Sequence, residues 1–139
     1  GAKLILHAHE NNINVIPLVG PSSILLAMMS SGLNGNNFSF NGYLPIDKNE
    51  RSKKIKKLEV HSKNNNQAQI FIETPYRNLS LFGELIKILN NNTFLCIAKN
   101  IGYKNQNIKT MRIIDWKANK GVIEKEPTIF IFQSGLIIF

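Results

Sequence analysis

Two short apolar runs constrain the fold of this chain more than any other feature. One is Ile70-Phe71-Ile72, which stops at Glu73-Thr74-Pro75, and the other is Phe94–Ala98. Between them, apolar residues recur with a helical period from Leu79 to Leu89. Continuous apolar runs of this length are typical of strands buried on both faces. Strands that alternate with helices predict a sheet with helices packed against it.

The segments on either side extend this pattern. We expect helices over residues 2–10, 24–29 and 48–63, a short turn or helix at 115–119, and strands at 15–18, 38–40, 108–114 and 127–132. The helix over 24–29 is apolar on nearly all sides, so it should be packed inside the domain. The late succession of strands predicts some antiparallel pairs. The expected fold class is α/β, a three-layer, mixed, mostly parallel sheet flanked by helices.

The chain opens on Gly1, and a helical segment begins at Ala2 with no capping residue ahead of it. We therefore interpret residues 1–12 as the end of a linking helix from an N-terminal domain that lies outside this sequence. A length of 139 residues suits one compact unit. Residues 13–139 are then the C-terminal α/β domain.

Composition and charge narrow the class of protein. Lys and Arg number 17 against 9 Asp and Glu, a net charge of +8, which favours polyanionic partners such as nucleic acid. No apolar run approaches the roughly 20 residues of a membrane helix, so we expect a soluble protein without a membrane partner. Cys96 is the single cysteine and cannot form an internal disulfide, which favours the cytoplasm.

The remaining reactive residue types carry no recognisable chemistry. His7, His9 and His61 have no metal-ligand spacing with Cys96, so we expect no metal site. Cys96 lies in an apolar run and should behave as a small hydrophobe. The apolar tail 136–139 fits either a strand or the contact surface of a homodimer.

Three breaks follow predicted strands, at Gly20–Ser23, Glu73–Arg77 and Lys99–Gly102. In sheets of this class, ligands bind beyond the carboxyl ends of strands. The first break either caps the following helix with a Ser hydroxyl, the reading that spacing alone favours, or offers a helix N-terminus to an anion. In the second, Glu73 and Arg77 form a local ion pair, again the favoured reading, or Arg77 faces a phosphate.

The helix expected over 48–63 has Asp47 in position to cap it and Ile55, Leu58 and Val60 as its apolar positions. It carries a cluster of basic residues at Arg51, Lys53, Lys54, Lys56 and Lys57. They form either a surface that contacts an RNA backbone or a solvated helix face, and the residues alone favour neither.

Several ordered motifs resemble the tetrapyrrole methylase superfamily, in particular its branch of 16S ribosomal RNA cytidine 2′-O-methyltransferases. They are Val15–Ser23, Ser31-Gly32-Leu33, Phe38–Pro45, Arg51 and Phe71–Asn78. The opening Gly1-Ala2 is similar to the end of the segment with which that branch leaves its first domain. The resemblance covers residues 1 to about 100 and extends to Pro127-Thr128-Ile129.

The resemblance implies an S-adenosylmethionine-dependent methyltransferase with two α/β domains and the cofactor between them, of which this chain supplies one wall. It places cofactor contacts on Ser22, Ser23, Glu73, Ile101, Pro127 and Thr128. It also implies ribosomal RNA or the small ribosomal subunit as partner, with Arg51, Lys53, Lys54, Lys57 and Arg77 as RNA-binding candidates. No catalytic residue is assigned, and a fragment of this kind should be inactive alone.

Two departures from that branch concern its substrate surface. The branch usually has an Ala-Arg-Glu-Leu-Thr-Lys-like loop where this chain reads Ala98-Lys99-Asn100-Ile101, and commonly His where Tyr76 stands. Two other functions therefore stay open beside methylation of a ribose 2′-hydroxyl. One is a methyltransferase of a small acceptor such as a tetrapyrrole, and the other is a basic domain that binds RNA or a protein without catalysis.

Overall fold

The structure is a computed structural model that describes residues 1–119, 121 and 123–135. Its elements in chain order are α1 Ala2–Glu10, α2 Ser23–Ser31, β1 Phe38–Tyr43, α3 Lys48–Asn65, β2 Ala68–Ile72, the 3-10 turn η1 Pro75–Arg77, α4 Asn78–Ile88, β3 Phe94–Lys99, β4 Asn107–Arg112, α5 Ile113–Ala118 and β5 Thr128–Gln133. The tail 136–139, predicted to be a strand or a dimer surface, lies outside the described residues.

The five strands form one sheet in the order β1-β2-β5-β3-β4. β1 and β2 pair in parallel, whereas β2 with β5, β5 with β3, and β3 with β4 pair antiparallel. The predicted mixed sheet is confirmed, but the expectation that parallel pairs dominate is wrong. β5 is inserted between β2 and β3 and runs against both of them, which no local sequence pattern indicates.

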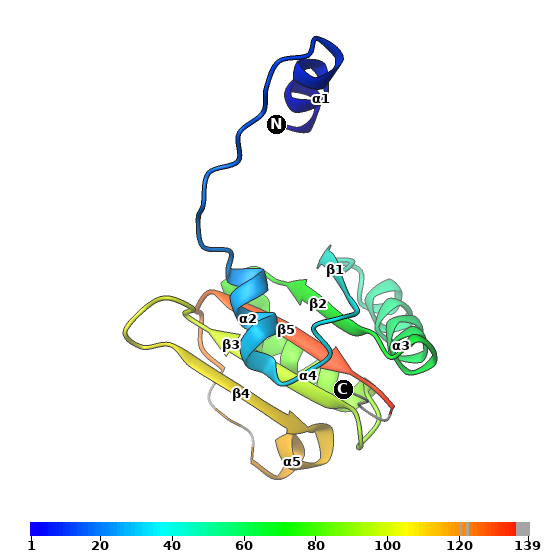
Figure 1. Cartoon of the computed structure of the whole chain (residues 1–139). Helices are drawn as coiled ribbons and strands as arrows, with labels where there is room; N and C mark the ends of the chain where they lie inside the picture. The colour runs from blue at the N-terminus through cyan, green and yellow to red at the C-terminus, as the bar shows by residue number, and fades with distance from the viewer. Residues whose placement is uncertain (120, 122, 136–139) are drawn as a thin grey trace.

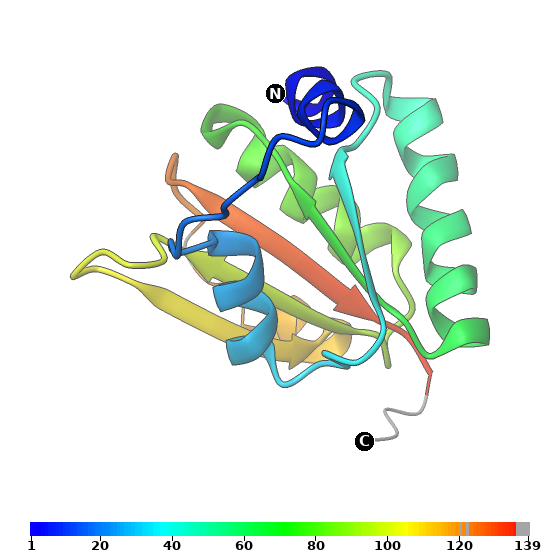
Figure 2. The ribbon, with the colours of Figure 1, turned by 45° about the horizontal axis from the view of Figure 1, so that its top comes forward.

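Helices cover both faces of the sheet, as predicted (Figures 1 and 2). On one face, Ala27 and Met28 of α2 pack against Ile70, Cys96 and Ile131. The other face carries the larger core, in which side chains of α3, α4 and α5 surround Phe71, Phe130 and Phe132. Because the central strands are buried on both faces, their sequences read as continuous apolar runs rather than alternating ones.

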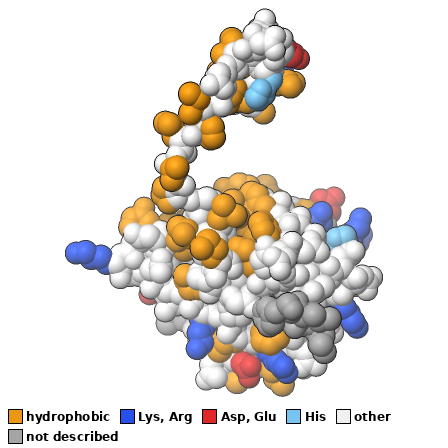
Figure 3. Space-filling view, viewed as in Figure 1, with side chains coloured by type: hydrophobic (Ala, Val, Ile, Leu, Met, Phe, Trp, Pro, Cys, Tyr) orange, Lys and Arg blue, Asp and Glu red, His pale blue; other side chains and the backbone are white. Residues whose placement is uncertain are grey.

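The helix α2 is less buried than its sequence suggests. Ala27 and Met28 are buried, whereas Leu25, Leu26 and Met29 are exposed. Figure 3 shows apolar side chains gathered on this surface. The prediction that α2 packs inside the domain is therefore wrong for its outer half.

The first 22 residues stand apart from the sheet. No residue of α1 is buried, and the chain then runs in extended form to α2, as Figure 1 shows. A strand was expected at residues 15–18, but this segment pairs with no strand, and Leu18 and Val19 are fully exposed. The expected strand is wrong because its apolar residues have no neighbouring strand among the described residues.

The helix α3 begins as predicted. The carboxylate of Asp47 accepts a hydrogen bond of 2.9 Å from the backbone N–H of Glu50, which satisfies one of the free donors of the first turn. Ile55 and Leu58 are buried as expected, but Val60 is exposed. The sequence therefore located the cap and most of the buried face of this helix.

Candidate functional site

Strand direction explains which loops meet at the candidate site. The pairings make β1, β2 and β3 run one way and β4 and β5 the other. The carboxyl ends of β2 and β3 therefore lie at the same edge as the amino end of the intervening β5. Glu73 follows β2, Asn100 and Ile101 follow β3, and Pro127 precedes β5, so residues far apart in sequence share this edge.

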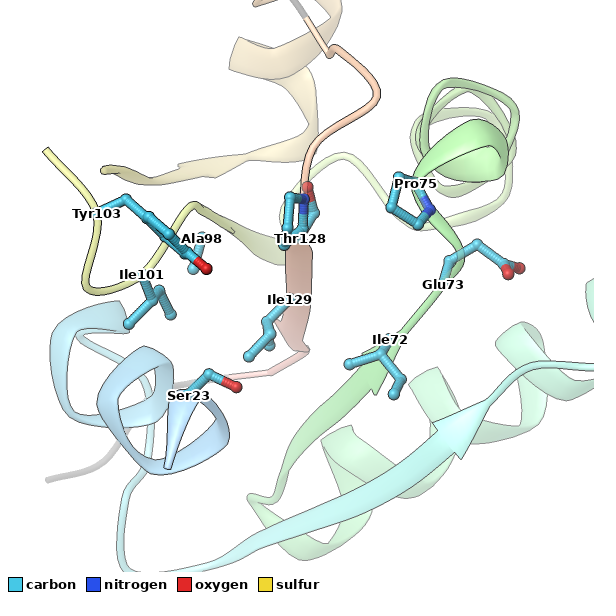
Figure 4. Close-up of a pocket in the computed structure, with 10 residues that line it drawn as sticks. Ser23, Ile72, Glu73, Pro75, Ala98, Ile101, Tyr103, Thr128 and Ile129 are labelled. Atoms are coloured by element: carbon cyan, nitrogen blue, oxygen red, sulfur yellow. The ribbon is translucent and has the colours of Figure 1, made fainter. Parts of the chain in front are cut away.

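A cavity of about 440 Å³ opens at this edge (Figure 4). It is lined by Ser23, Ile72, Glu73, Pro75, Ala98, Ile101, Tyr103, Pro127, Thr128 and Ile129. Ser23, Glu73, Ile101, Pro127 and Thr128 were expected to lie together from the sequence, and the structure brings them together. Ser22 does not line the cavity, although it directly precedes Ser23.

The other lining residues, which are Ile72, Pro75, Ala98, Tyr103 and Ile129, were not among the predicted cofactor contacts. Ile72, Ala98 and Ile129 lie at the ends of the central strands, where one face turns towards the cavity. Their apolar character was read as core packing, which it also is for Ala98 and Ile129. Tyr103 was not among the cofactor contacts expected from the sequence. Its place in the loop after β3 was the signal that could have added it to the site.

The side chains of the cavity divide into apolar and polar groups. In Figure 4, Ile72 and Ile129 form the floor, and the hydroxyls of Ser23 and Tyr103 point inward. The Glu73 carboxylate points away from Ser23 and Ile129 in the same view. A small, partly apolar ligand with several hydrogen-bonding groups suits such a lining, and the volume falls within the roughly 300–1,000 Å³ of ligand pockets.

The predicted ion pair of Glu73 with Arg77 is absent, although both residues are described. The Glu73 carboxylate instead accepts hydrogen bonds from the Thr74 backbone N–H at 2.7 Å and the Thr74 hydroxyl at 3.1 Å. The Arg77 guanidinium lies 5.3 Å from the centre of the Tyr76 ring. The turn after β2 is therefore fixed by local hydrogen bonds, and a ligand at this wall meets the backbone of Glu73 more readily than its carboxylate.

Capping of α2 by a Ser hydroxyl was also expected and is not seen. Ser22 occupies the N-cap position with extended backbone angles, but its side chain makes no cap hydrogen bond. The start of α2 therefore presents backbone N–H groups towards the same edge as the cavity without a side-chain partner.

One predicted RNA-binding residue is contradicted by its surroundings. The Arg51 side chain is buried, and its guanidinium donates to both carboxylate oxygens of Glu84 and to the carbonyls of Pro45 and Ile46. These acceptors engage four of the five guanidinium N–H donors, which leaves too few for a bidentate contact with a phosphate. Arg51 is thus a structural link between α3, α4 and the preceding loop, and not part of the basic outer face.

Lys53, Lys54 and Lys57 are exposed on α3 and keep the geometry expected of a basic surface. They lie on a different side of the sheet from α2, on the helix beside β1 (Figure 2). The structure therefore gives two separate features, a cavity at the strand ends and a basic helix face at the margin of the sheet.

Trp116 and Cys96 have structural roles. Trp116 is buried and donates from its indole N–H to the carbonyl of Leu95 at 2.9 Å. Cys96 is fully buried, and burial raises the pKa of its thiol. Within residues 1–119, 121 and 123–135, no group of three His, Cys, Asp or Glu side chains is placed to hold a metal ion. No helix in that part of the chain is long and apolar enough to cross a membrane.

Comparison with known proteins gives relatives by sequence. No protein-family model matches the chain. It is 33% identical over 127 residues to ribosomal RNA small subunit methyltransferase I of Buchnera aphidicola subsp. Schizaphis graminum, which covers 89% of this chain and 43% of that protein. The protein of the same name from Vibrio cholerae is 26% identical over 121 residues, covering 85% of this chain and 41% of its own length. The chain thus spans less than half the length of these relatives.

Solved structures give the fold. The methyltransferase CobJ superposes with a TM-score of 0.55 at 15% identity, covering 96% of this chain and 56% of that one. The cobalt precorrin-4 methyltransferase CbiF superposes with a TM-score of 0.54 at 9% identity, covering 95% and 57% of the two chains. The predicted resemblance is confirmed: the chain is similar in sequence to the ribosomal RNA small subunit methyltransferase I proteins, and it shares its fold with the methyltransferases CobJ and CbiF.

Proposed function

We propose that this chain forms one wall of the S-adenosylmethionine site of a methyltransferase that modifies small-subunit ribosomal RNA at a ribose 2′-hydroxyl. The observation that carries the proposal is the cavity in which Ser23, Ile101 and Thr128 meet at one edge of the sheet. The names of the relatives support methyl transfer and the RNA substrate. In this proposal residues 1–12 lead in from an N-terminal domain, and residues 13–139 are the C-terminal domain.

The lining fits the chemical groups of the cofactor. The apolar side chains Ile72, Ile101 and Ile129 suit the faces of an adenine ring, and the hydroxyls of Ser23 and Tyr103 suit its ribose and amino-acid groups. The N–H groups at the start of α2 lie where a carboxylate is favoured. The bound cofactor would supply an electrophilic methyl group on a sulfonium.

This chain contributes binding and orientation to that reaction. Methyl transfer requires the acceptor oxygen in line with the methyl carbon and protected from water, and rigid walls provide both. Removal of the 2′-hydroxyl proton also requires a base. None of the cavity side chains is a strong candidate, because Glu73 points away and is engaged by Thr74. The base therefore belongs to the facing wall or to the RNA.

The RNA is assigned to the basic face of α3. Lys53, Lys54 and Lys57 are exposed there and provide positive charge for a phosphate backbone. Arg77 is half-buried beside Tyr76 near the cavity, so it suits a contact close to the methylated nucleotide. Arg51 has no part in this surface.

The test is mass spectrometry of small-subunit ribosomal RNA from cells that lack the full-length protein. One methyl group should be missing, and the full-length wild-type protein should restore it. Ser23→Tyr adds a ring at the cavity mouth from an exposed position and should fail to restore the methyl group. Ser30→Tyr, also exposed on α2 but away from the cavity, is the matched control and should succeed. An unchanged RNA methylation profile in the deletion strain would exclude the RNA substrate and favour a small acceptor.

A further inference from the structure

Glu126 lies outside the cavity lining, but its side chain and its backbone are bonded to several of the segments that form the cavity. The Glu126 carboxylate accepts a hydrogen bond of 2.8 Å from the Asn100 side chain and forms an ion pair of 3.6 Å with Lys99. Its backbone carbonyl accepts hydrogen bonds from the Asn78 side chain at 2.7 Å and the Thr128 hydroxyl at 2.9 Å. Glu126 therefore joins the loop after β3, the start of α4 and the segment before β5.

Asn100, the residue of the loop after β3 that contacts Glu126, has an uncommon backbone conformation. Asn100 adopts φ of 50°, the left-handed conformation that few residues other than glycine adopt readily. Its side chain is buried against Glu126, and its backbone N–H donates to the carbonyl of Pro127 at 3.0 Å. These two bonds hold the loop in the conformation that turns Ile101 and Tyr103 towards the cavity.

Asn78, the residue at the start of α4 that contacts Glu126, is buried at a cost in free energy. Asn78 is fully buried, and its amide donates to the Glu126 carbonyl and to the Thr128 hydroxyl at 3.1 Å. Its own carbonyl oxygen is a buried polar atom without a hydrogen-bond partner among the described residues. An unpaired buried acceptor costs roughly 1–3 kcal/mol. An apolar residue at position 78 would remove this cost, but it would also remove the hydrogen bonds to the Glu126 carbonyl and the Thr128 hydroxyl.

We infer that Glu126 is the positioning residue of the proposed cofactor cavity: its carboxylate fixes the loop after β3 through Asn100, and its backbone carbonyl holds the side chains of Asn78 and Thr128. This inference rests on the proposed function. Glu126 itself does not line the cavity. It acts through Ile101, Tyr103 and Thr128, whose places determine whether a ligand meets its partners at hydrogen-bonding distance.

The sheet does not require this network. β3 and β5 are already joined by a continuous antiparallel ladder from Phe94 to Lys99, which also fixes the backbone of Thr128. The Glu126 contacts therefore order the loop after β3 and the side chains of Asn78 and Thr128. The carboxylate of Glu59, which is buried, offers a comparison at a different place. Glu59 of α3 accepts hydrogen bonds from the backbone and side chain of Asn90 and from Thr93, in the loop before β3 at the opposite edge.

The experiment measures calorimetric affinity of the full-length protein for S-adenosylhomocysteine, together with the midpoint of thermal unfolding. Asn100→Asp places a second carboxylate against Glu126 and should weaken binding about tenfold, the loss expected for one charge-assisted hydrogen bond. Asn100→Asp combined with Glu126→Gln restores one donor opposite one acceptor, so it should return the affinity to roughly twofold of wild type. Asp tolerates the left-handed conformation, as Asn does.

Glu59→Gln is the control for a loss of stability alone, since it should lower the unfolding midpoint and leave affinity unchanged. Two results would overturn the inference: Asn100→Asp that binds as tightly as wild type, or a combined variant that folds without regaining affinity. Should Asn100→Asp fail to fold, Glu126→Gln alone decides, because it keeps the side-chain shape, removes the charge and should still weaken binding. Failure of the wild-type protein to bind S-adenosylhomocysteine would instead reject the proposed function and the inference with it.

Discussion

Arg51 and Glu84 form a paired contact between α3 and α4, with Nε to Oε2 at 2.8 Å and Nη2 to Oε1 at 2.5 Å. Both side chains are largely buried, with 11% and 12% of their surfaces exposed. The two N–H groups of Nη1 donate to the carbonyls of Pro45 and Ile46, so Arg51 also fixes the segment that leads into α3. A pair with these extra hydrogen bonds is costly to break, because the remaining charge stays buried.

Replacing Glu84 with Gln should therefore destabilise the domain. The substitution removes the charge that compensates Arg51, and we expect a loss of about 3 kcal/mol in the free energy of unfolding. Urea denaturation of wild type and variant measures it. Glu50→Gln is the control, because Glu50 is an exposed carboxylate on α3 outside the pair, and its effect should stay within about 0.5 kcal/mol. Equal effects of the two substitutions would show that the pair adds nothing to stability.

The pair of Arg51 and Glu84 also predicts that the free energy of unfolding depends on pH. The hydrogen bond from Arg51 lowers the pKa of Glu84 below its ordinary value of 4.5, although burial opposes this shift. A carboxyl whose pKa is lower in the folded state contributes stability above the unfolded pKa, and this contribution is lost as pH falls through the folded pKa. The difference in unfolding free energy between wild type and Glu84→Gln should be constant from pH 7 to about 5 and shrink below pH 4.5. A difference that does not change down to about pH 3 would contradict the assignment.

The first turns of α2 and α3 are capped differently, so substitutions at their N-cap residues should differ in their effect on stability. Asp47 caps α3 through its side chain, whereas Ser22 makes no such bond at α2. Asp47→Ala should cost about 1 kcal/mol of unfolding free energy, and Asp47→Ser should retain most of the cap. Ser22→Ala should cost only a few tenths by the same measurement, because no cap bond is removed. A larger cost at Ser22 than at Asp47 would show that the hydroxyl caps α2 in solution.

Sequence patterns located most elements because their signals are local. Strands β2 and β3 followed from continuous apolar runs, the α3 cap from Asp47, and the site from the breaks after the strands. The direction of β5 is not local information. The direction of β5 determines that the segment before this strand, rather than the one after it, reaches the cavity. The expected contacts at Pro127 and Thr128 came from family resemblance and not from a local pattern.

The errors have the same physical origin. Arg51 was grouped with the lysines of α3 because its partner, Glu84, lies on another helix and no spacing connects them. The segment 15–18 has strand composition but no neighbour to pair with, and pairing, not composition, makes a strand. The outer half of α2 is as apolar as its inner half, so sequence could not tell which residues remain exposed.

The basic face of α3 gives the last prediction. Each lysine that neutralises an RNA phosphate adds to the slope of binding affinity against salt concentration. In the full-length protein, combined Lys53→Gln, Lys54→Gln and Lys57→Gln should weaken ribosomal RNA binding and lower the logarithmic salt slope by about 2, or roughly 0.7–0.9 for each phosphate that is no longer neutralised. Filter binding at several salt concentrations measures both quantities.

A charge-matched variant separates the effect of the α3 surface on RNA binding from the effect of the net charge of the protein. Lys3, Lys109 and Lys117 are also exposed, and the latter two lie on β4 and α5, at the opposite margin of the sheet from α3. Their replacement by Gln removes the same charge and should leave the salt slope nearly unchanged, because these lysines face no phosphate. If both triple variants lowered the slope equally, RNA would be responding to the overall positive charge, and α3 would have no specific role in holding it.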